Sequence, residues 1–437
     1  MRSVTASALV GLLAAVSVAT GQVVSKPEST IIASFLRDVA AGDRNAQDAF
    51  WRLVAERHSP IVEPILDNDH DVLATFVWKD PGDTKSVIVG ARLNGVEPLN
   101  DPAARMTRVA GTDVWYLSAR LPVDAELLYQ LFVNPPDSVQ AAQRAARPDP
   151  LNPLLYPERD DPMYDATQLW RDGSIARMPA VKANPWLAPA SATASGPTRE
   201  YDIKSAFLTL ANPRKVWVHV PPGGQLQDPN VLILFDGGTT YQSRIPTPTI
   251  LDNLYAAGKI RPTVAVLVDN GGAARALDLT FSDGFVKFLA DELMPWLQRE
   301  YPFHADPSRT VLGGDSLGGL IGAYAALQRP DVFGGVLAQS GAFQERNGHD
   351  VPHPEPEWLA REFATAPKTT TSFYLEVGTL ENRPEGNDGT SLLASNRHLR
   401  DVLTARGFVV RYLETYGDHD PVHWRRTLPD ALAYLLK

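Results

Sequence analysis

The 437-residue chain contains no cysteine, and this absence excludes several kinds of chemistry. Without a thiol there is no disulfide bond, no thiolate metal ligand and no cysteine nucleophile. Positive charge is also scarce, because 41 basic residues are outnumbered by 51 acidic ones and the formal net charge is -10. An acidic surface disfavours nonspecific binding to nucleic acid, and no basic run reverses that balance. We therefore expect no nucleic-acid partner.

The sequence also lacks an apolar run long enough to span a membrane as a helix. The apolar run from Ala6 to Ala19 follows Arg2 and ends near small residues that could mark a cleavage site. A short apolar run between a basic residue and small residues is typical of a secretory signal peptide, although an alanine-rich N-terminal helix is the alternative. We therefore predict a signal peptide at 1–21 and an exported protein, either periplasmic or secreted.

The composition is that of a folded globular protein, with 44% hydrophobic and 21% charged residues. The length exceeds that of one typical domain, so two domains are expected. Residues 28–58 carry apolar side chains at helical spacing and predict a helical preface. Residues 59–135 contain strand-like runs separated by turn residues and predict a small antiparallel β-sandwich of the immunoglobulin-like type. These runs lie at 72–78, 87–93, 114–121 and 127–133.

In the remainder of the chain, the pattern of apolar and polar residues changes at about residue 200. Residues 136–199 are rich in proline, serine, alanine and glycine, and we predict a linker there. Residues 200–437 alternate short apolar runs with helical patterns, which predicts a mostly parallel sheet covered by helices on both faces. Ligands in such sheets bind at the carboxyl ends of the strands. The apolar runs lie at 216–220, 231–235, 264–268, 310–314, 335–340, 373–378 and 409–416.

The stretch GGDSLGG at 313–319 fits the nucleophile-elbow pattern G-x-S-x-G around Ser316. A strand-like run precedes the serine and a helical pattern follows it, and flanking glycines suit a sharp turn between the two. Backbone N–H groups at the start of that helix would point at the reacting oxygen. We predict that Ser316 is the nucleophile of an α/β-hydrolase, and an ordinary helix N-cap is the alternative.

A serine nucleophile needs a base, and in α/β-hydrolases the acid and then the histidine follow the serine along the chain. His419 and His423 both follow the last strand-like run, where that histidine is expected. Asp420 suits a helix N-cap and Pro421 suits the first helical position, which leaves His419 in the loop. We favour His419 as the base and expect His423 to pack at the rim of the pocket. The other histidines after the serine lie in a polar loop or a helical pattern: His349, His353 and His398.

The segment HDPVH imitates the zinc-binding pattern H-E-x-x-H, which needs both histidines on one face of a helix. Because Pro421 would start the helix after His419, the two rings do not share a helix face. We therefore expect no metal, and the serine chemistry requires no organic cofactor.

The acid is expected in the loop after the strand-like run at 373–378. Glu376 lies within that run, where we expect it to point to a face of the sheet or to form an ion pair. Glu381 comes just past its end, and Asp388 lies further out in a glycine-rich stretch. We choose Glu381, with Asp388 second, to orient the imidazole and stabilise its charged form.

An oxyanion hole needs two N–H donors. The residue after the nucleophile, Leu317, is one candidate, and a loop after an earlier strand should supply the other. Gly237 and Gly238 follow the run at 231–235, and either glycine would allow close backbone approach. A plain turn is the alternative.

These blocks, taken together, resemble the enterochelin (enterobactin) esterase family of α/β-hydrolases over residues 58–437. The resemblance rests on VLILFDGGTTY, PTPTILDNL, VAVLVDNGGAARALDL, ELMPWL, GGDSLGG, VGTLEN and GDHDPVHWR in that order. It implies that Ser316 and His419 match the family's nucleophile and histidine, and that Glu381 stands where an acid is found in related sequences. The segment before DPLNP also resembles the family's N-terminal domain.

The same resemblance implies residues that contact the substrate. Arg275 matches an arginine thought to face the anionic ligand, and Trp424 with Arg425 match a W-R pair after the catalytic loop. Gly238 stands where the family often carries a bulky aromatic residue, and Tyr241 follows a little later. Arg244 and Arg275 would add positive potential to an acidic protein, unless each is an ordinary surface or ion-paired arginine. The predicted substrate-binding residues are Arg275, Tyr241, Arg244, Trp424 and His423.

The expected activity is that of a serine esterase acting on a small-molecule ester. The resemblance implies a catecholate siderophore, an enterobactin-like trilactone, with any iron arriving as part of the substrate. A feruloyl or acetyl esterase acting on plant polysaccharide is an alternative enzyme. A noncatalytic siderophore- or glycan-binding protein is the alternative from another class.

Overall fold

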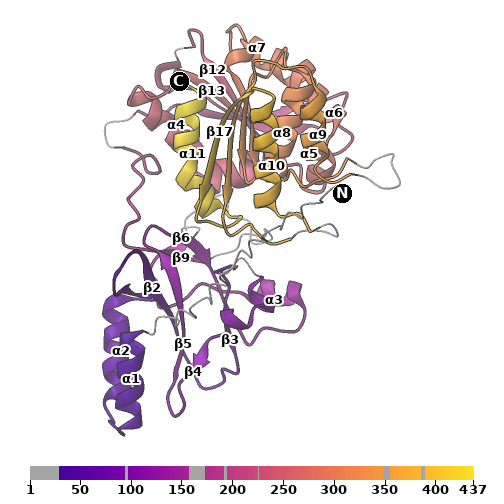
Figure 1. Ribbon diagram of the computed structural model, residues 1–437. Helices are drawn as coiled ribbons and strands as arrows, with labels where there is room; N and C mark the ends of the chain where they lie inside the picture. The colour runs from indigo at the N-terminus through magenta and orange to yellow at the C-terminus, as the bar shows by residue number, and fades with distance from the viewer. Residues whose placement is uncertain are drawn as a thin grey trace, which may run out of the picture.

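The computed structural model describes residues 29–93, 97–156, 173–190, 194–224, 226–347, 355–384 and 389–437. In these ranges the chain forms a β-rich N-terminal unit and a larger α/β unit (Figure 1). The predicted signal peptide lies outside the described residues and stays a prediction. No helix in the described ranges has the length and apolar character needed to cross a membrane.

Two helices begin the described chain, α1 (Thr30–Ala40) and α2 (Ala46–Arg57). Ser29 caps α1, because its hydroxyl accepts the Ile32 N–H at 3.0 Å. The apolar faces of the helices pack on one side of the first β-sheet, and the cluster includes Ile32, Phe35, Phe50, Val54, Ile61 and Val77.

The rest of the N-terminal unit consists of antiparallel strands in three small sheets. A four-stranded sheet has the order β1 (Ile61–Ile65), β2 (Asn68–Lys79), β5 (Val114–Pro122), β4 (Thr107–Arg108). The others are β3 (Val87–Val89) with β7 (Leu131–Val133), and β6 (Glu126–Tyr129), β9 (Gly173–Arg177), β8 (Leu155–Tyr156). They share one apolar core that includes Phe76, Val87, Leu117, Leu127 and Ala176.

The segment predicted as a linker contributes to this unit, which differs from the sequence prediction. Helix α3 (Val139–Ala145) and strands β8 and β9 all lie within residues 136–199. β9 pairs with β6, and Ala176 and Met178 are buried in the core of the unit. The proline- and serine-rich composition hid these short elements, because each is too short to show a periodic pattern.

The α/β unit is built on an eight-stranded sheet, and the predicted mostly parallel arrangement is confirmed. Strand β11 runs antiparallel to both of its neighbours, β10 and β13, whereas all the other neighbouring strands pair in parallel. The order is β10 (Thr198–Ile203), β11 (Arg214–His219), β13 (Thr263–Val268), β12 (Asn230–Leu234), β14 (Thr310–Asp315), β15 (Gly335–Gln339), β16 (Ser372–Gly378), β17 (Val409–Thr415).

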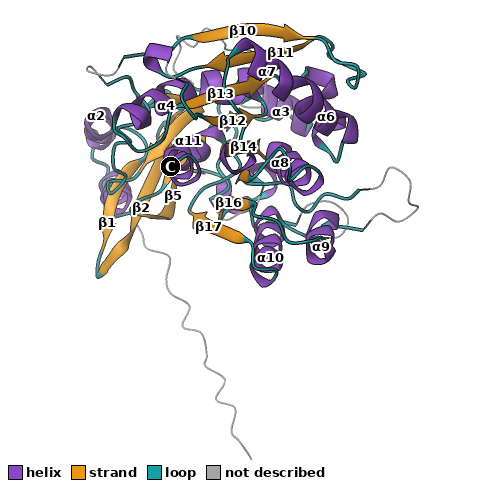
Figure 2. Cartoon of the chain, turned by 90° about the horizontal axis from the view of Figure 1, so that it is seen from above, coloured by secondary structure: helices purple, strands orange, loops and turns teal. Residues whose placement is uncertain are grey.

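Helices cover both faces of this sheet, as Figure 2 shows from above. Side chains of the central strands alternate between two cores, because successive residues of a strand point to opposite faces. Leu232 of β12 packs with α4 (Thr247–Ala256) and α11 (Pro421–Leu435). Ile233 packs on the other face with α8 (Leu317–Gln328). That face is also covered by α5 (Arg275–Leu279), α6 (Asp283–Lys287), α7 (Met294–Glu300), α9 (Trp358–Thr365) and α10 (Leu392–Ala405).

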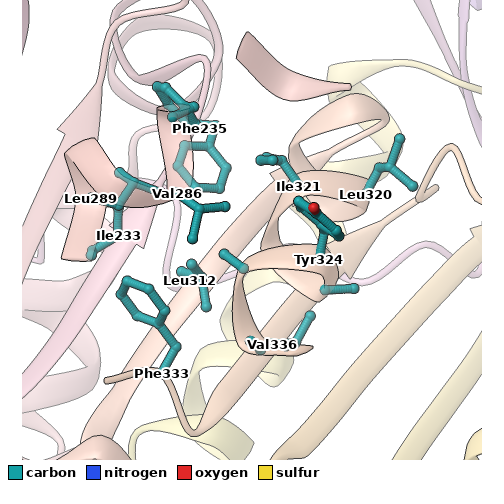
Figure 3. Packing of buried hydrophobic residues seen from close by; sticks show 14 of the residues in the cluster. Ile233, Phe235, Val286, Leu289, Leu312, Leu320, Ile321, Tyr324, Phe333 and Val336 are labelled. Carbon is teal, nitrogen blue, oxygen red and sulfur yellow. The ribbon is translucent and has the colours of Figure 1, made fainter. Parts of the chain in front are cut away.

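The core on the α8 face fixes the helix that follows the predicted nucleophile. Figure 3 shows the strand residues Ile233, Leu312 and Val336, with Phe235 just after β12, packing against α8 at Leu320, Ile321 and Tyr324. The strand residues Ile233, Leu312 and Val336 are fully buried. The start of α8 is therefore held rigidly at the carboxyl end of β14.

Candidate active site

Ser316 occupies a sharp turn between β14 and α8. Its backbone has φ 55° and ψ -118°, a region that side chains disfavour and that clusters at functional sites. Its N–H donates to the Gln339 carbonyl at 2.9 Å, and its own carbonyl accepts the Ala342 N–H at 3.0 Å. In the described structure the hydroxyl makes no capping hydrogen bond, so the N-cap alternative has no support from the geometry.

The glycines around the serine have a steric reason. A Cβ atom on Gly319 would lie 2.8 Å from the Cβ of Ala338, and one on Gly313 would lie 1.7 Å from the Leu337 carbonyl oxygen. Both positions therefore require glycine for β14, α8 and β15 to pack this closely.

His419 and Glu381 form the pair that the chain order predicts. The imidazole Nδ1 lies 2.6 Å from Oε1 of Glu381. The other carboxylate oxygen, Oε2, accepts the Gly378 N–H at 2.6 Å and the Ser340 hydroxyl at 2.7 Å. The carboxylate is therefore fixed by three donors, and it orients the ring. Asp388, the second choice, lies outside the described residues.

Glu381 and His419 each stabilise the charged form of the other. Burial opposes ionisation of Glu381, but its hydrogen bond to His419 and the charge of that ring hold the pKa of the carboxyl below its ordinary value. Burial likewise opposes protonation of His419, yet the hydrogen bond and charge of Glu381 raise the pKa of the imidazole above its ordinary value. An imidazole in this setting can take up a proton and return it.

His423 differs from His419 although it is only four residues further along. Its Nε2 lies 2.6 Å from the Thr415 hydroxyl, and its Nδ1 lies 3.0 Å from the Asp418 carbonyl oxygen. Burial lowers the pKa of this ring. The predicted cap is confirmed, because the Asp420 carboxylate accepts the N–H groups of Val422 and His423 and Pro421 begins α11. The two rings therefore have separate partners and do not share a helix face.

Trp424 supports the pair from behind. Its indole N–H donates to the Ser340 hydroxyl at 2.9 Å. The edge of its ring meets His419 with centroids 5.0 Å apart and an interplanar angle of 86°. Ser340 therefore links the indole to the Glu381 carboxylate, and these contacts hold the imidazole in place.

A cavity of about 290 Å³ opens beside Ser316 and His419. Three arginines border it, and one of them, Arg92, comes from the N-terminal unit. Arg275 was expected from the sequence, and its guanidinium forms a two-pronged ion pair with Asp236 at 2.7 and 2.8 Å. The lining residues are Arg92, Arg275, Ser316, Leu317, Ala342, Gln344, Glu345, Arg383, Leu392 and His419.

Four residues predicted to bind substrate are placed elsewhere. Tyr241 is fully buried and its hydroxyl donates to the Gln339 side chain at 2.9 Å. Arg244 is also buried, and its carbonyl accepts the Tyr156 hydroxyl at 3.2 Å. Trp424 and His423 pack behind the catalytic loop. Among the described residues the cavity lining therefore includes none of these four side chains.

The predicted oxyanion donors lie at the start of two helical turns. Leu317 begins α8 and borders the cavity. Gly237 and Gly238 begin a turn that continues to Arg244, and both have a packing reason to be glycine. A Cβ atom on Gly237 would lie 2.4 Å from the Leu267 carbonyl carbon, and one on Gly238 would lie 2.5 Å from the Trp217 ring. The oxyanion role of either glycine stays a prediction.

Comparison with known proteins places this arrangement in a family. Residues 209–435 match the family described as "Putative esterase", and residues 73–187 match "Enterochelin esterase, N-terminal". The second match extends well past residue 135, in agreement with the strands β8 and β9.

Curated relatives and solved structures support the same family as the two family matches. The chain is 30% identical over 435 residues to an iron(III) enterobactin esterase of Dickeya dadantii, covering 93% of this chain and 96% of the relative. It is 28% identical to the iron(III) enterobactin esterase of Escherichia coli K12, covering 88% and 95%. The enterobactin esterase of Shigella flexneri, crystallised in the presence of enterobactin, superposes with a TM-score of 0.69 at 26% identity, covering 89% and 97%. The chain belongs to the enterochelin esterase family.

Proposed function

We propose that the protein is a serine esterase that hydrolyses the ester bonds of a catecholate siderophore of the enterobactin type. One observation carries the proposal: Ser316 on its strained turn and the His419–Glu381 pair border a single cavity that is also lined by three arginines. Relatives with enterobactin esterase activity in their names support the same substrate class.

In the proposed mechanism, the Ser316 hydroxyl attacks an ester carbonyl while Nε2 of His419 takes its proton. Glu381 stabilises the imidazolium that forms. The N–H of Leu317, with that of Gly237 or Gly238, stabilises the oxyanion. His419 then protonates the leaving alcohol, and water hydrolyses the acyl-enzyme with the same histidine as base.

The arginines of the cavity suit an anionic substrate. Arg275, Arg92 and Arg383 carry planar guanidinium groups that can bind catecholate or carboxylate oxygens and stack on aromatic rings. Each also has a carboxylate neighbour, respectively Asp236, Asp418 and Glu97. Those carboxylates hold the guanidinium planes in fixed orientations. Iron, when present, enters as part of the substrate.

The proposal also covers the N-terminal unit, for which we suggest an immunoglobulin-like sandwich. Its antiparallel sheets enclose one shared apolar core, which supports this assignment.

The test is hydrolysis of ferric and iron-free enterobactin beside a simple aryl ester, with the products identified by mass spectrometry. We expect linear trimer and shorter catechol-serine fragments from the native protein and none from Ser316→Ala. Turnover of feruloyl sugars with none of the trilactone would favour the feruloyl esterase alternative. Failure of a fluorophosphonate probe to label Ser316 would favour the noncatalytic alternative.

A further inference from the structure

Both loops that carry the histidine–glutamate pair rest on the N-terminal unit. Leu380, the residue before Glu381, is buried in the apolar core of that unit. Tyr416, three residues before His419, packs against the same core. Figure 1 shows the N-terminal strands β6 and β9 next to the end of the α/β unit where these loops lie. The N-terminal unit is therefore in direct contact with side chains of the two loops that carry the pair.

A charged contact extends this support to the residue beside the histidine. The Arg92 guanidinium donates to Oδ1 of Asp418 at 2.8 Å, and both side chains are about four-fifths buried, with 21% and 18% exposed. The same oxygen accepts the backbone N–H of His419 at 2.8 Å. One carboxylate oxygen thus connects an arginine of the N-terminal unit to the main chain of the predicted base.

The opposite side of Asp418 is held by the α/β unit itself. Its backbone carbonyl accepts from Nδ1 of His423 at 3.0 Å. Arg92 is held in turn by Glu97, which also accepts from Arg383 at 2.9 Å. The loop before α11 is therefore fixed from two sides, and the only side chain of the N-terminal unit that borders the cavity, among the residues described, makes one of these contacts.

We propose that Arg92 is a positioning residue of the esterase, acting through Asp418 on His419, so that the N-terminal unit completes the active site of the α/β unit. The inference rests on the proposed function, because it assigns a role relative to the catalytic base. A displacement of about 1 Å at a catalytic group can cost 100-fold in rate. Losing the arginine should therefore lower turnover even for a substrate that never touches it.

The closing experiment measures Arg92→Ala, Arg92→Lys and Asp418→Ala with para-nitrophenyl acetate, which is uncharged, and with ferric enterobactin, which is anionic. We expect Arg92→Ala to lower kcat by about 10- to 100-fold for both substrates. Arg92→Lys should recover part of the loss, since it keeps the charge but not the planar fork. Arg120→Ala is the matched control, because Arg120 pairs with Asp71 in the N-terminal unit and neither residue lines the cavity.

A pH profile separates positioning from simple structural support. The charged and titratable groups around the His419 ring are Glu381, Asp315, Asp418, Arg92, Arg275 and His423. The negative charge of Asp418 raises the pKa of His419, and Arg92 offsets that charge. Removing Arg92 should therefore move the acidic limb of kcat/KM to higher pH, whereas Arg120→Ala should leave it in place.

A double-mutant cycle completes the test. If Arg92 acts through Asp418, Arg92→Ala should have little further effect in the Asp418→Ala background. Additive losses, or unchanged kcat for para-nitrophenyl acetate in Arg92→Ala, would overturn the inference. A raised KM confined to ferric enterobactin would also overturn it, because it would make Arg92 a substrate contact only. These results leave the proposed function standing as long as Ser316→Ala is inactive; an active Ser316→Ala overturns both.

Discussion

Two of the histidine–carboxylate pairs in the α/β unit have similar hydrogen bonds but different surroundings. His419 pairs with Glu381 at 2.6 Å beside a cavity that also reaches Ser316. His219 pairs with Asp252 at 3.0 Å, and its other ring nitrogen lies 2.9 Å from the Thr198 hydroxyl. The second set therefore also has a hydroxyl, an imidazole and a carboxylate in series.

What separates the two sets is backbone strain and space. Ser316 lies on a turn with positive φ next to a helix N-terminus, whereas Thr198 begins the edge strand β10. The hollow beside His219 has no room for a water molecule, while the cavity beside His419 measures about 290 Å³. The comparison teaches that a hydroxyl, an imidazole and a carboxylate form a candidate active site only where a substrate can reach the hydroxyl. At the other location the same groups tie β10 and β11 to α4.

The largest expected difference in kcat is between variants that lack the Ser316 hydroxyl and variants that lack the Thr198 hydroxyl. Ser316→Ala should lower kcat by about 10⁴-fold or more, because no other group can form the acyl-enzyme. Thr198→Val should leave kcat unchanged. Ester hydrolysis assays measure kcat of both variants, and circular dichroism checks that both are folded. A similar loss of kcat in the two variants would contradict the assignment of Ser316 as the nucleophile.

The second largest difference in activity is expected between variants of the two carboxylates, Glu381 and Asp252. Glu381→Gln should lower kcat by about 10²- to 10⁴-fold, because an amide can stabilise the wrong tautomer of His419 and cannot stabilise its charged form. Asp252→Asn should keep full activity and lower the free energy of unfolding by about 1–3 kcal/mol, since it disturbs buried hydrogen bonds to His219 and the Gly196 N–H. Kinetics and urea unfolding of the pair of variants separate the two roles.

A third prediction compares two buried glutamates near the site. Burial raises the pKa of Glu376 to about 8, whereas the pKa of Glu381 is held low by His419. A raised pKa means that the folded state keeps the proton, so the native protein loses stability as the pH rises from the ordinary glutamate value towards 8. Glu376→Gln removes that loss, and its melting temperature relative to the native protein should rise by several degrees between pH 5 and pH 8. A difference that does not change with pH would show that Glu376 is ionised in the folded state.

The last prediction compares His419 with the neighbouring histidine, whose removal should cost little activity. His423→Ala should keep kcat within about tenfold of the native value, because its ring supports the loop from behind. His419→Ala should lose as much as Ser316→Ala. Side-by-side kinetics test this, and a larger loss in His423→Ala than in His419→Ala would reverse the assignment of the base.

Much of the α/β unit can be predicted from sequence for a physical reason. Strands buried on both faces are continuous apolar runs, so β12 through β16 can be predicted from the sequence alone. The glycine pattern at the elbow is equally readable, because close packing of β14 and α8 against β15 excludes side chains at Gly313 and Gly319. Strand β10 escaped notice because its residues, TREYDI, are mostly polar and exposed at the edge of the sheet.

The site itself is only partly visible in the sequence. Ser316, His419 and Glu381 follow from chain order and strand ends, since each lies just after a strand of the parallel sheet. Tyr241, Arg244 and Trp424 were expected at the substrate because of their type and position, but burial of the side chain depends on packing that local sequence does not specify. Arg92 could not be found this way, because its contact with Asp418 joins segments 326 residues apart.

The strained backbone of Ser316 has a consequence for experiments on bound substrate. A residue with φ 55° and ψ -118° is one that glycine would occupy with less strain. Ser316→Gly should therefore fold at least as well as the active protein while lacking the hydroxyl that cleaves the ester. The position at which the chain is most reactive is thus also the position at which an inert and relaxed replacement can capture an uncut siderophore for crystallography.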